Sequence, residues 1–227
     1  MQNIIEKNSL LKGLTTKALK DVLNLGFQRQ LNLSEILFHQ GEPAQTLFLI
    51  SEGRIKLVEL NENGEEVVLR FVGPGEITAA VSVLSNLPYP ASAHVVQEGE
   101  ALCWNGNVLR DVMQKYPEIA MNALDIVVGR LIEVQSRFLE LKTERVEQRI
   151  ARTLLRLLKR GGEKVKTGIQ IDFPLSRQDI AEHSGTTLYT VSRTISNWEK
   201  QGWVKSGREK IIISDLHALV TISEDLQ

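Results

Sequence analysis

The sequence predicts an α+β protein built from a β-roll of the jelly-roll kind, a long helix and a C-terminal winged helix-turn-helix. Three observations support this expectation. Short apolar runs separated by glycine-containing turns fill residues 35–104, a heptad stripe occupies 124–141, and two short helical patterns flank a glycine within 175–200. We therefore expect three parts, a β-roll domain at 1–116, a long helix at 117–142 and a winged helix-turn-helix domain at 143–227.

Composition excludes several classes of protein. Of the 227 residues, 42% are hydrophobic and 24% are charged, which is typical of a globular protein and not of a disordered tail, a collagen-like repeat or a pure coiled coil. No apolar run approaches the roughly 18 residues of a membrane span, and no basic-then-apolar signal peptide follows Met1. The single cysteine, Cys103, cannot form an internal disulfide. We expect a cytoplasmic protein with no membrane partner.

The front and back of the chain differ in charge. Residues 1–144 contain 13 Lys and Arg against 18 Asp and Glu, whereas residues 145–227 contain 14 against 10, so the net charges are −5 and +4. An acidic front joined to a basic back suggests that only the C-terminal part faces a polyanion such as nucleic acid. A bias of this size also arises by chance, so charge alone does not decide the function.

The elements of the roll follow from short runs and turns. Residues 1–25 have apolar side chains at helical spacing and predict a helical lead-in. Turns are predicted at Glu52-Gly53, Glu98-Gly99 and Asn63-Gly64, and the last is a strong hairpin signal because both turn positions need a positive φ. The predicted strands are 36–38, 47–50, 55–58, 67–71, 94–96 and 101–104.

A regular apolar stripe follows the roll. Its members are spaced 3, 4, 3, 4 and 3 residues apart: Leu124, Val127, Leu131, Val134, Phe138 and Leu141. This is the a/d pattern of a coiled coil, with charged residues such as Arg130 and Glu133 beside it. We expect the stripe to form the interface of a homodimer. The alternative is that it packs on the chain's own β-domain.

The segment between the stripe and the last motif has a hinge, a helix and a strand. The break at 142–144 predicts the hinge, and an apolar face from Val146 to Leu158 predicts a helix that ends at Gly161-Gly162. Residues 169–173 alternate as a short strand before Pro174.

The most informative stretch runs from Leu175 to Ser214. Ser176 is a predicted N-cap with Asp179 as its capping-box acid, Gly185 ends this helix, and Thr187 caps a second one. The second helix is expected to bury Leu188, Val191, Ile195 and Trp198 and to expose Tyr189, Thr190, Ser192, Arg193 and Asn197. Residues 205–210 are basic and precede three isoleucines, which predicts a β-hairpin wing. Together these features are typical of a DNA-binding helix-turn-helix.

Taken as a whole, the chain resembles the Crp/Fnr family of bacterial transcription regulators from about Leu10 to Ile222. The resemblance rests on the order of three modules: Gly41-Glu42-Pro43-Ala44 and Gly73-Pro74-Gly75-Glu76 in the roll, the heptad helix, and the motifs 175–181 and 190–193. It implies a homodimer that binds a near-palindromic site on double-stranded DNA, with each second helix in a major groove. It also implies RNA polymerase as a partner if the protein is an activator.

The resemblance implies roles for individual residues. Arg193 resembles the family arginine that contacts a guanine, and Ser192 resembles the adjacent base-contacting serine of the Fnr branch. Many members carry a glutamate where this chain has Tyr189, so Tyr189 either alters the preferred half-site or makes a phosphate or packing contact. Phosphate contacts are implied for Ser176, Arg177, Gln178, Thr187 and Thr190, and for Arg208 and Lys210 on the wing.

In this family the roll usually holds an effector. The resemblance places the pocket at Gly75, Glu76, Ala79, Ala80, Ala91, Ser92 and His94. Cyclic-AMP binders have Gly-Glu and Arg-Ser pairs where this sequence has Ala79-Ala80 and Ala91-Ser92. A phosphate buried there would have no cation nearby, at a cost of several kcal/mol, so we expect an effector other than a cyclic nucleotide. The iron–sulfur branch needs four cysteines and is excluded.

A haem-dependent sensor of nitric oxide or carbon monoxide is the main alternative, and a cyclic-nucleotide-responsive regulator is a weaker one. The possible iron ligands are His39, His94, Cys103, Met113 and Met121. The competing interpretations are that His94 is a structural residue of a strand and that Cys103 is a buried small hydrophobe rather than a redox sensor. We expect His183 and His217 at the surface of the C-terminal domain.

The sequence contains no catalytic or metal-binding constellation. Its four histidines are scattered and no Cys/His/Asp group is close together, so we expect no enzyme and no metal site. The prediction is a sequence-specific transcription regulator whose cofactor is unknown. A β-roll dimer that only binds other proteins is the competing class, which salt-sensitive DNA binding would exclude.

Overall fold

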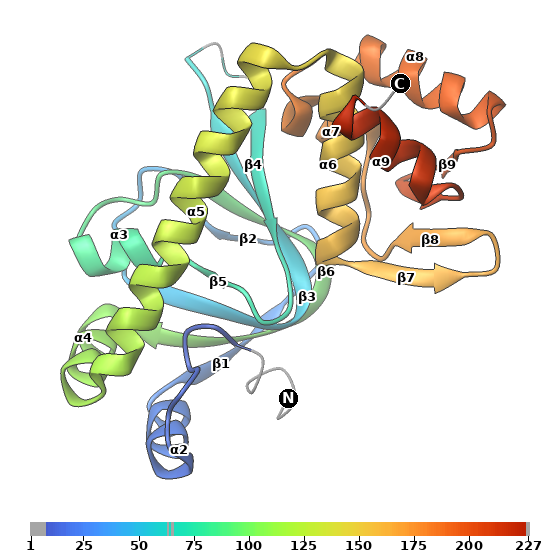
Figure 1. Ribbon diagram of the computed structural model, residues 1–227. Helices are drawn as coiled ribbons and strands as arrows, with labels where there is room; N and C mark the ends of the chain where they lie inside the picture. The colour runs from blue at the N-terminus through green and yellow to red at the C-terminus, as the bar shows by residue number, and fades with distance from the viewer. Residues whose placement is uncertain (1–7, 63, 65, 226–227) are drawn as a thin grey trace. The chain divides into compact units, whose positions relative to one another are not determined.

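The computed structural model describes residues 8–62, 64 and 66–225, so Asn63 of the predicted hairpin lies outside the described residues (Figure 1). The chain divides into two compact units, one made of Met1–Glu66 and Arg70–Val134, the other of Val67–Leu69 and Gln135–Gln227. No helix among the described residues has both the length and the apolar character that a membrane span requires.

The first unit is a β-roll with short helices. In the described part of the chain its sheet has six strands in the order β1-β6-β3-β4, with β2 paired to β6 and β5 to β3. The strands are β1 Phe27–Leu31, β2 Ile36–Phe38, β3 Thr46–Leu60, β4 Glu66–Val72, β5 Ile77–Thr78 and β6 Ser92–Asn105. The helices are α2 Thr16–Asn24, α3 Ala80–Ser85, α4 Gly106–Lys115 and the first part of α5 Pro117–Thr143.

Strands β3 and β6 run straight through two of the predicted turns. The two strands pair antiparallel over most of their length, with register shifts between Ile50 and Ile55. The turn predictions at Glu52-Gly53 and Glu98-Gly99 are therefore wrong. A Cβ on Gly53 or Gly99 would overlap the backbone of the opposite strand, and Gly53 has φ +80°, so the glycines permit a bulge and a close approach.

Two buried clusters hold the roll together. One lies on the helical side and includes Trp104, whose Nε1 donates to the Val22 carbonyl at 2.9 Å. The other fills the interior of the roll and includes Cys103, which is fully buried as a small hydrophobe. Burying apolar side chains of this size stabilises the fold by about 1.5–3 kcal/mol each.

The second unit contains four helices of its own in the described residues and a small sheet. The helices are α6 Val146–Arg160, α7 Arg177–Ser184, α8 Leu188–Lys200 and α9 Leu216–Glu224. The strands are β7 Gly162–Val165, β8 Gly168–Ile171, β9 Val204–Gly207 and β10 Lys210–Ile213, in the sheet order β7-β8-β10-β9. Strand β7 was not predicted because its sequence, Gly-Glu-Lys-Val, is mostly polar and exposed.

Candidate nucleic-acid interface and ligand cavity

Two caps define the turn between α7 and α8. The Ser176 hydroxyl accepts from the Asp179 amide at 3.0 Å and the Ser176 amide donates to the Asp179 carboxylate at 2.9 Å, which is the predicted capping box. Gly185 ends α7 at φ +63°, and Thr187 begins α8 by accepting from the Thr190 amide at 3.2 Å. Each such cap stabilises its helix by about 0.5–2 kcal/mol.

Helix α8 is anchored by its inner face. Val191, Ile195 and Trp198 are fully buried, and Trp198 Nε1 donates to Glu147 on α6 at 2.9 Å. The prediction that Leu188 joins this stripe is wrong, because Leu188 is 47% exposed as the first residue of the helix, one turn ahead of the buried stripe.

The outer face of α8 presents polar side chains. Tyr189 is 75% exposed, and Arg193, also exposed, lies four residues later and therefore one turn along the same side. Ser192 and Thr190 are half-buried beside them. This face has the arrangement that a recognition helix needs for reaching base edges in a major groove.

The predicted wing is present as the β9–β10 hairpin. Its strands pair Lys210 with Gly207 across a turn at Arg208 and Glu209, and Glu209 has φ +55°. The Glu209 carbonyl accepts from the Leu175 amide at 3.0 Å, which attaches the wing tip to the segment before α7. Arg208 and Lys210 are exposed, as is Lys205 on β9.

Arg177 is half-buried and makes side-chain contacts within the second unit. Its Nη2 donates to the Ser206 hydroxyl at 2.8 Å and lies 3.5 Å from a Glu199 carboxylate oxygen, while Glu199 also accepts from the Ser206 amide and hydroxyl. The Arg177 side chain therefore ties α7 to α8 and β9. Gln178 is exposed and donates to Glu182 at 2.7 Å.

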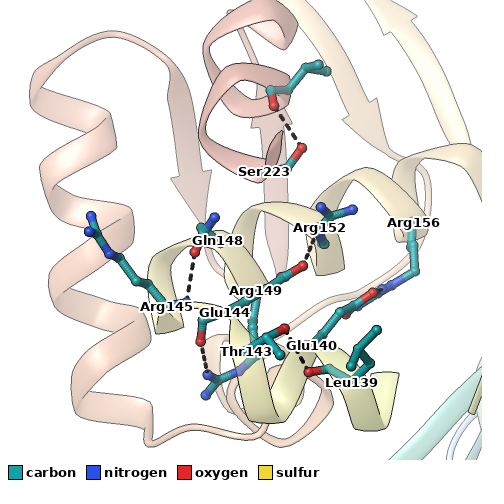
Figure 2. A network of polar contacts seen from close by, with 11 residues as sticks. Leu139, Glu140, Thr143, Glu144, Arg145, Gln148, Arg149, Arg152, Arg156 and Ser223 are labelled. Atoms are coloured by element: carbon teal, nitrogen blue, oxygen red, sulfur yellow. Dashed lines mark hydrogen bonds and ion pairs between the residues drawn. The ribbon is translucent and has the colours of Figure 1, made fainter. Parts of the chain in front are cut away.

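Arginines of α6 also make internal contacts, at the junction with α5 (Figure 2). Arg156 Nη1 lies 2.7 Å and 2.8 Å from the two Glu140 carboxylate oxygens, and Arg152 lies 2.9 Å from Glu144. Part of the positive surplus of residues 145–227 is therefore balanced within the protein, and the charge available to a polyanion is smaller than the sequence count indicates.

Arg149 positions the turn of the helix-turn-helix. It donates to the carbonyls of Ser184 and Gly185, each at 3.1 Å, and to the carbonyl of Glu144 at 3.0 Å. One guanidinium group thus joins the start of α6 to the last turn of α7. No motif in the sequence marks this residue.

His183 is buried, so its predicted surface position is wrong, whereas His217 is exposed as expected. The His183 side chain lies against Arg137 from the last turns of α5. Burial first, and then the charges of Arg137, Arg156 and Arg160, lower the pKa of His183 to about 3.

The apolar stripe of α5 is open to solvent in the single chain. Leu124, Leu131, Val134, Phe138 and Leu141 are each more than half exposed, and Val127 is half-buried. The exposed apolar face is wider than the predicted heptad, since it also includes Met121, Val128, Ile132 and Leu139. An exposed apolar face of this extent marks an interaction surface.

A cavity of about 190 Å³ opens in the roll. Among its lining residues are the rings of Phe38 and Tyr89, stacked with their centroids 3.9 Å apart, and the guanidinium side chains of Arg70 and Arg130. The other lining residues are Leu57, Thr78, Ala79, Ala80, Val81, Ser82, Pro90 and Ala91.

The cavity corrects one part of the sequence argument. The expectation that a phosphate here would have no cation nearby is wrong, because Arg70 and Arg130 line the cavity. The signals that could have located them were an arginine in the middle of the apolar run 67–71 and one beside the heptad stripe. Of the predicted pocket residues, Ala79, Ala80 and Ala91 line the cavity, and Gly75, Glu76, Ser92 and His94 do not.

Models of two known domain families match the chain. The model of the cyclic nucleotide-binding domain matches residues 28–116, and that of the Crp-like helix-turn-helix domain matches residues 148–222. Both domains thus occur in the order that the fold shows. The chain belongs to the Crp/Fnr family of transcription regulators.

Relatives of this Crp/Fnr regulator match along nearly the whole chain. The CRP-like cAMP-activated global transcriptional regulator of Mycobacterium tuberculosis is 25% identical over 96% of this chain and 98% of its own length. The cyclic AMP receptor protein of Thermus thermophilus is 28% identical over 87% of this chain and 88% of its own length. The structure of FixK2 from Bradyrhizobium japonicum matches with a TM-score of 0.76 and 22% identity, covering 87% of this chain and 96% of FixK2. A match at this identity shows the fold alone.

The polar groups of the lining bear on which ligands this regulator's cavity accepts. No carboxylate lines the cavity in the described part of the chain, so the hydroxyl groups of a ribose would have no acidic acceptor. The Ser92 hydroxyl accepts from the Gln40 amide at 3.0 Å and lies outside the lining.

The candidate haem ligands are not brought together at the cavity. Cys103 is in the core, where burial raises the pKa of its thiol to about 12, and His39 is exposed. His94 is half-buried on β6 with its pKa lowered by burial, while Met113 packs beside the helical-side core and Met121 is exposed on α5. Within the described residues, no three His, Cys, Asp or Glu side chains form a metal-binding group.

Proposed function

We propose that this Crp/Fnr regulator binds double-stranded DNA as a homodimer, with α8 of each copy in the major groove of one half-site of a near-palindromic promoter site. The observation that supports this most strongly is the exposed polar face of α8 beside a wing with exposed cations. Regulators of this architecture place the second helix in the groove and let neighbouring elements contact the backbone. Such a protein acts in the cytoplasm, with RNA polymerase as a partner if it activates.

Arg193 is the proposed reader of a base. It is exposed on α8, and its two-pronged guanidinium matches the O6 and N7 acceptors of guanine. Ser192 and Tyr189 flank it and are the further proposed base contacts. The proposed phosphate contacts are Ser176, Arg177, Gln178, Thr187, Thr190, Arg208 and Lys210, and Arg177 also holds α7 to β9 through Ser206.

The exposed apolar face of α5 is the proposed dimer interface. The a/d spacing of Leu124, Leu131 and Phe138 suits packing against the same helix of a second copy. A dimer of this kind presents two α8 helices related by a twofold axis, which is why the DNA site is expected to be a near-palindrome.

The test compares salt titrations on two duplexes. A specific site is first selected from a random duplex pool, and binding to that site and to a scrambled duplex is measured at several salt concentrations. Arg193→Ala should cost about 1–3 kcal/mol on the selected site and little on the scrambled one. Lys210→Ala should weaken both equally and lower the salt slope by about one unit per monomer.

Lys164→Ala is the matched control, because Lys164 is an exposed cation of the same four-stranded sheet but lies on β7, away from the wing strands β9 and β10. Lys164→Ala should leave the salt titrations on the selected and the scrambled duplex unchanged. If Arg193→Ala lowered the affinity for both duplexes equally, Arg193 would be a phosphate contact rather than a base contact. Absence of salt-sensitive DNA binding by the unaltered protein would favour the protein-interaction module instead.

A further inference from the structure

We propose that the cavity of the roll binds a small organic monocarboxylate whose acidic group is held by Arg70 and Arg130. The proposal goes beyond the proposed function, which assigns DNA binding and dimerisation, because it gives the roll of this regulator a ligand. It names a ligand class that differs from the cyclic nucleotides of the domain family.

Two guanidinium groups reach the cavity from different elements. Arg70 lies on β4 and Arg130 on α5, and no acidic side chain lines the cavity within the described residues. Arg70 Nη2 lies 3.8 Å from Glu76 Oε1, and Arg130 donates to the Ile77 carbonyl. These contacts orient both side chains. Guanidinium groups bind a carboxylate through paired N–H···O bonds, which suits an anionic group placed between them.

Most of the remaining wall is carbon. The stacked rings of Phe38 and Tyr89 form one side, and small apolar residues such as Ala80 and Ala91 form much of the rest. The Tyr89 hydroxyl is already used, since it donates to the Thr46 carbonyl at 3.1 Å and accepts from the Thr46 amide at 3.2 Å. The cavity therefore offers two guanidinium groups and a remainder that is mostly apolar, apart from the hydroxyl side chains of Thr78 and Ser82.

Size and polarity together select the ligand class. The volume of about 190 Å³ is below the roughly 300–1,000 Å³ of pockets that hold drug-sized ligands. A nucleotide carries several ribose hydroxyls and base edges, and apart from the arginines and the hydroxyls of Thr78 and Ser82 the lining offers them no polar side chain except Tyr89, whose hydroxyl is already bonded to Thr46. A short carboxylate satisfies its one polar group at the arginines and buries the rest of its surface against the rings and alanines.

Arg130 links the ligand to the rest of the regulator. It precedes Leu131, which belongs to the exposed apolar face of α5. A carboxylate bound to Arg130 therefore contacts the helix that forms the proposed dimer interface. A ligand shifts a regulator between two states when it binds one of them more tightly, and contact with α5 is one way in which the ligand can distinguish them.

Titration calorimetry on the full-length protein tests the proposal. The probes are acetate, butyrate, hexanoate and benzoate, each against its neutral amide, with cyclic AMP as a further probe. We expect saturable binding of at least one carboxylate and at least tenfold weaker binding of its amide. Arg130→Gln and Arg70→Gln should each weaken that binding at least tenfold, and Arg130→Lys should weaken it less than Arg130→Gln.

Arg29→Gln is the control variant, because Arg29 is a cation of the same unit that pairs with Glu35 at 2.6 Å and does not line the cavity. It should leave carboxylate binding unchanged, and thermal melts should show that every variant is folded. The proposal is overturned if no carboxylate in the series binds, if the amides bind equally well, or if cyclic AMP binds more tightly than every carboxylate.

Measuring both DNA binding and carboxylate binding on the same protein distinguishes failure of this proposal from failure of the proposed function. Salt-sensitive DNA binding without carboxylate binding overturns the ligand class and leaves the DNA-binding function intact. Carboxylate binding that depends on Arg130, without any DNA binding, supports the ligand class and overturns the proposed function.

Discussion

A guanidinium nitrogen of Arg137 lies 2.8 Å from Nε2 of His183, and the imidazole is buried. Because arginine has only donors, Nε2 must accept, so the imidazole is neutral with its proton on Nδ1. Protonating His183 would place a buried cation in contact with the half-buried guanidinium of Arg137. This contact joins the end of α5 to α7, and it makes the second unit sensitive to acid.

The first prediction concerns pH. Unfolded histidine has a pKa of 6.5, whereas the pKa of folded His183 is lowered to about 3. Between these values the unfolded state binds the extra proton, so the free energy of unfolding should fall with falling pH, by about 1.4 kcal/mol per unit. Above about pH 6.5 the group contributes no slope. Urea unfolding at pH values from about 7.5 to about 5 measures this dependence of the free energy of unfolding on pH.

His183→Gln isolates that contribution, because the glutamine carbonyl can still accept from Arg137 but does not titrate. The free energy of unfolding of His183→Gln should depend less on pH over this range than that of the wild type. His217→Gln serves as the control, since His217 is exposed. Equal pH dependence of the wild type and His183→Gln would contradict the assignment of the lowered pKa.

The second prediction concerns Arg149. Arg149→Met removes hydrogen bonds to the carbonyls of Ser184, Gly185 and Glu144 and should destabilise the second unit by about 1–3 kcal/mol. Lys159→Met on the same helix removes an exposed cation and should cost less than about 0.5 kcal/mol. Urea unfolding compares the two variants, and similar losses would show that the contacts of Arg149 are not stabilising.

The third prediction concerns α5. Leu131→Asp should convert the dimer to monomer, because it places a charge in the apolar face, and Phe138→Ala should weaken association by roughly 2–5 kcal/mol if the ring is buried between copies. Sedimentation equilibrium gives the association constants. Ser136→Asp is the control, because Ser136 is exposed on the same helix but is not one of the heptad positions. A fully dimeric Leu131→Asp protein would rule out this interface.

The fourth prediction concerns the bulge between β3 and β6. A Cβ on Gly99 would overlap the backbone of Glu52, which no side-chain movement relieves, so Gly99→Ala should destabilise the roll by roughly 1–3 kcal/mol. Gly129→Ala meets nothing within 4 Å and replaces a helical glycine, so it should stabilise by about 0.5–1 kcal/mol. Thermal melts showing a stable Gly99→Ala protein would contradict the close approach.

Features that depend on neighbours along the chain were predictable. The capping box of Ser176 and Asp179, the αL position of Gly185 and the cap at Thr187 follow from which side chains can bond to nearby amides. The buried positions Val191, Ile195 and Trp198 follow from helical periodicity. The predictions failed where a strand continued through a glycine, because a bulge and a turn use the same residue types.

The order of roll, long helix and winged helix-turn-helix can be read from the residues alone, since hydrophobic period and turn chemistry are local properties. Which charged residues remain available to a ligand or to DNA depends on the folded structure. Arg149, Arg156 and Arg177 are bound to internal partners, and Arg70 and Arg130, far apart in the chain, meet at one cavity. The partner of a charge is set by distance in space, and long-range packing brings together residues that no local pattern relates.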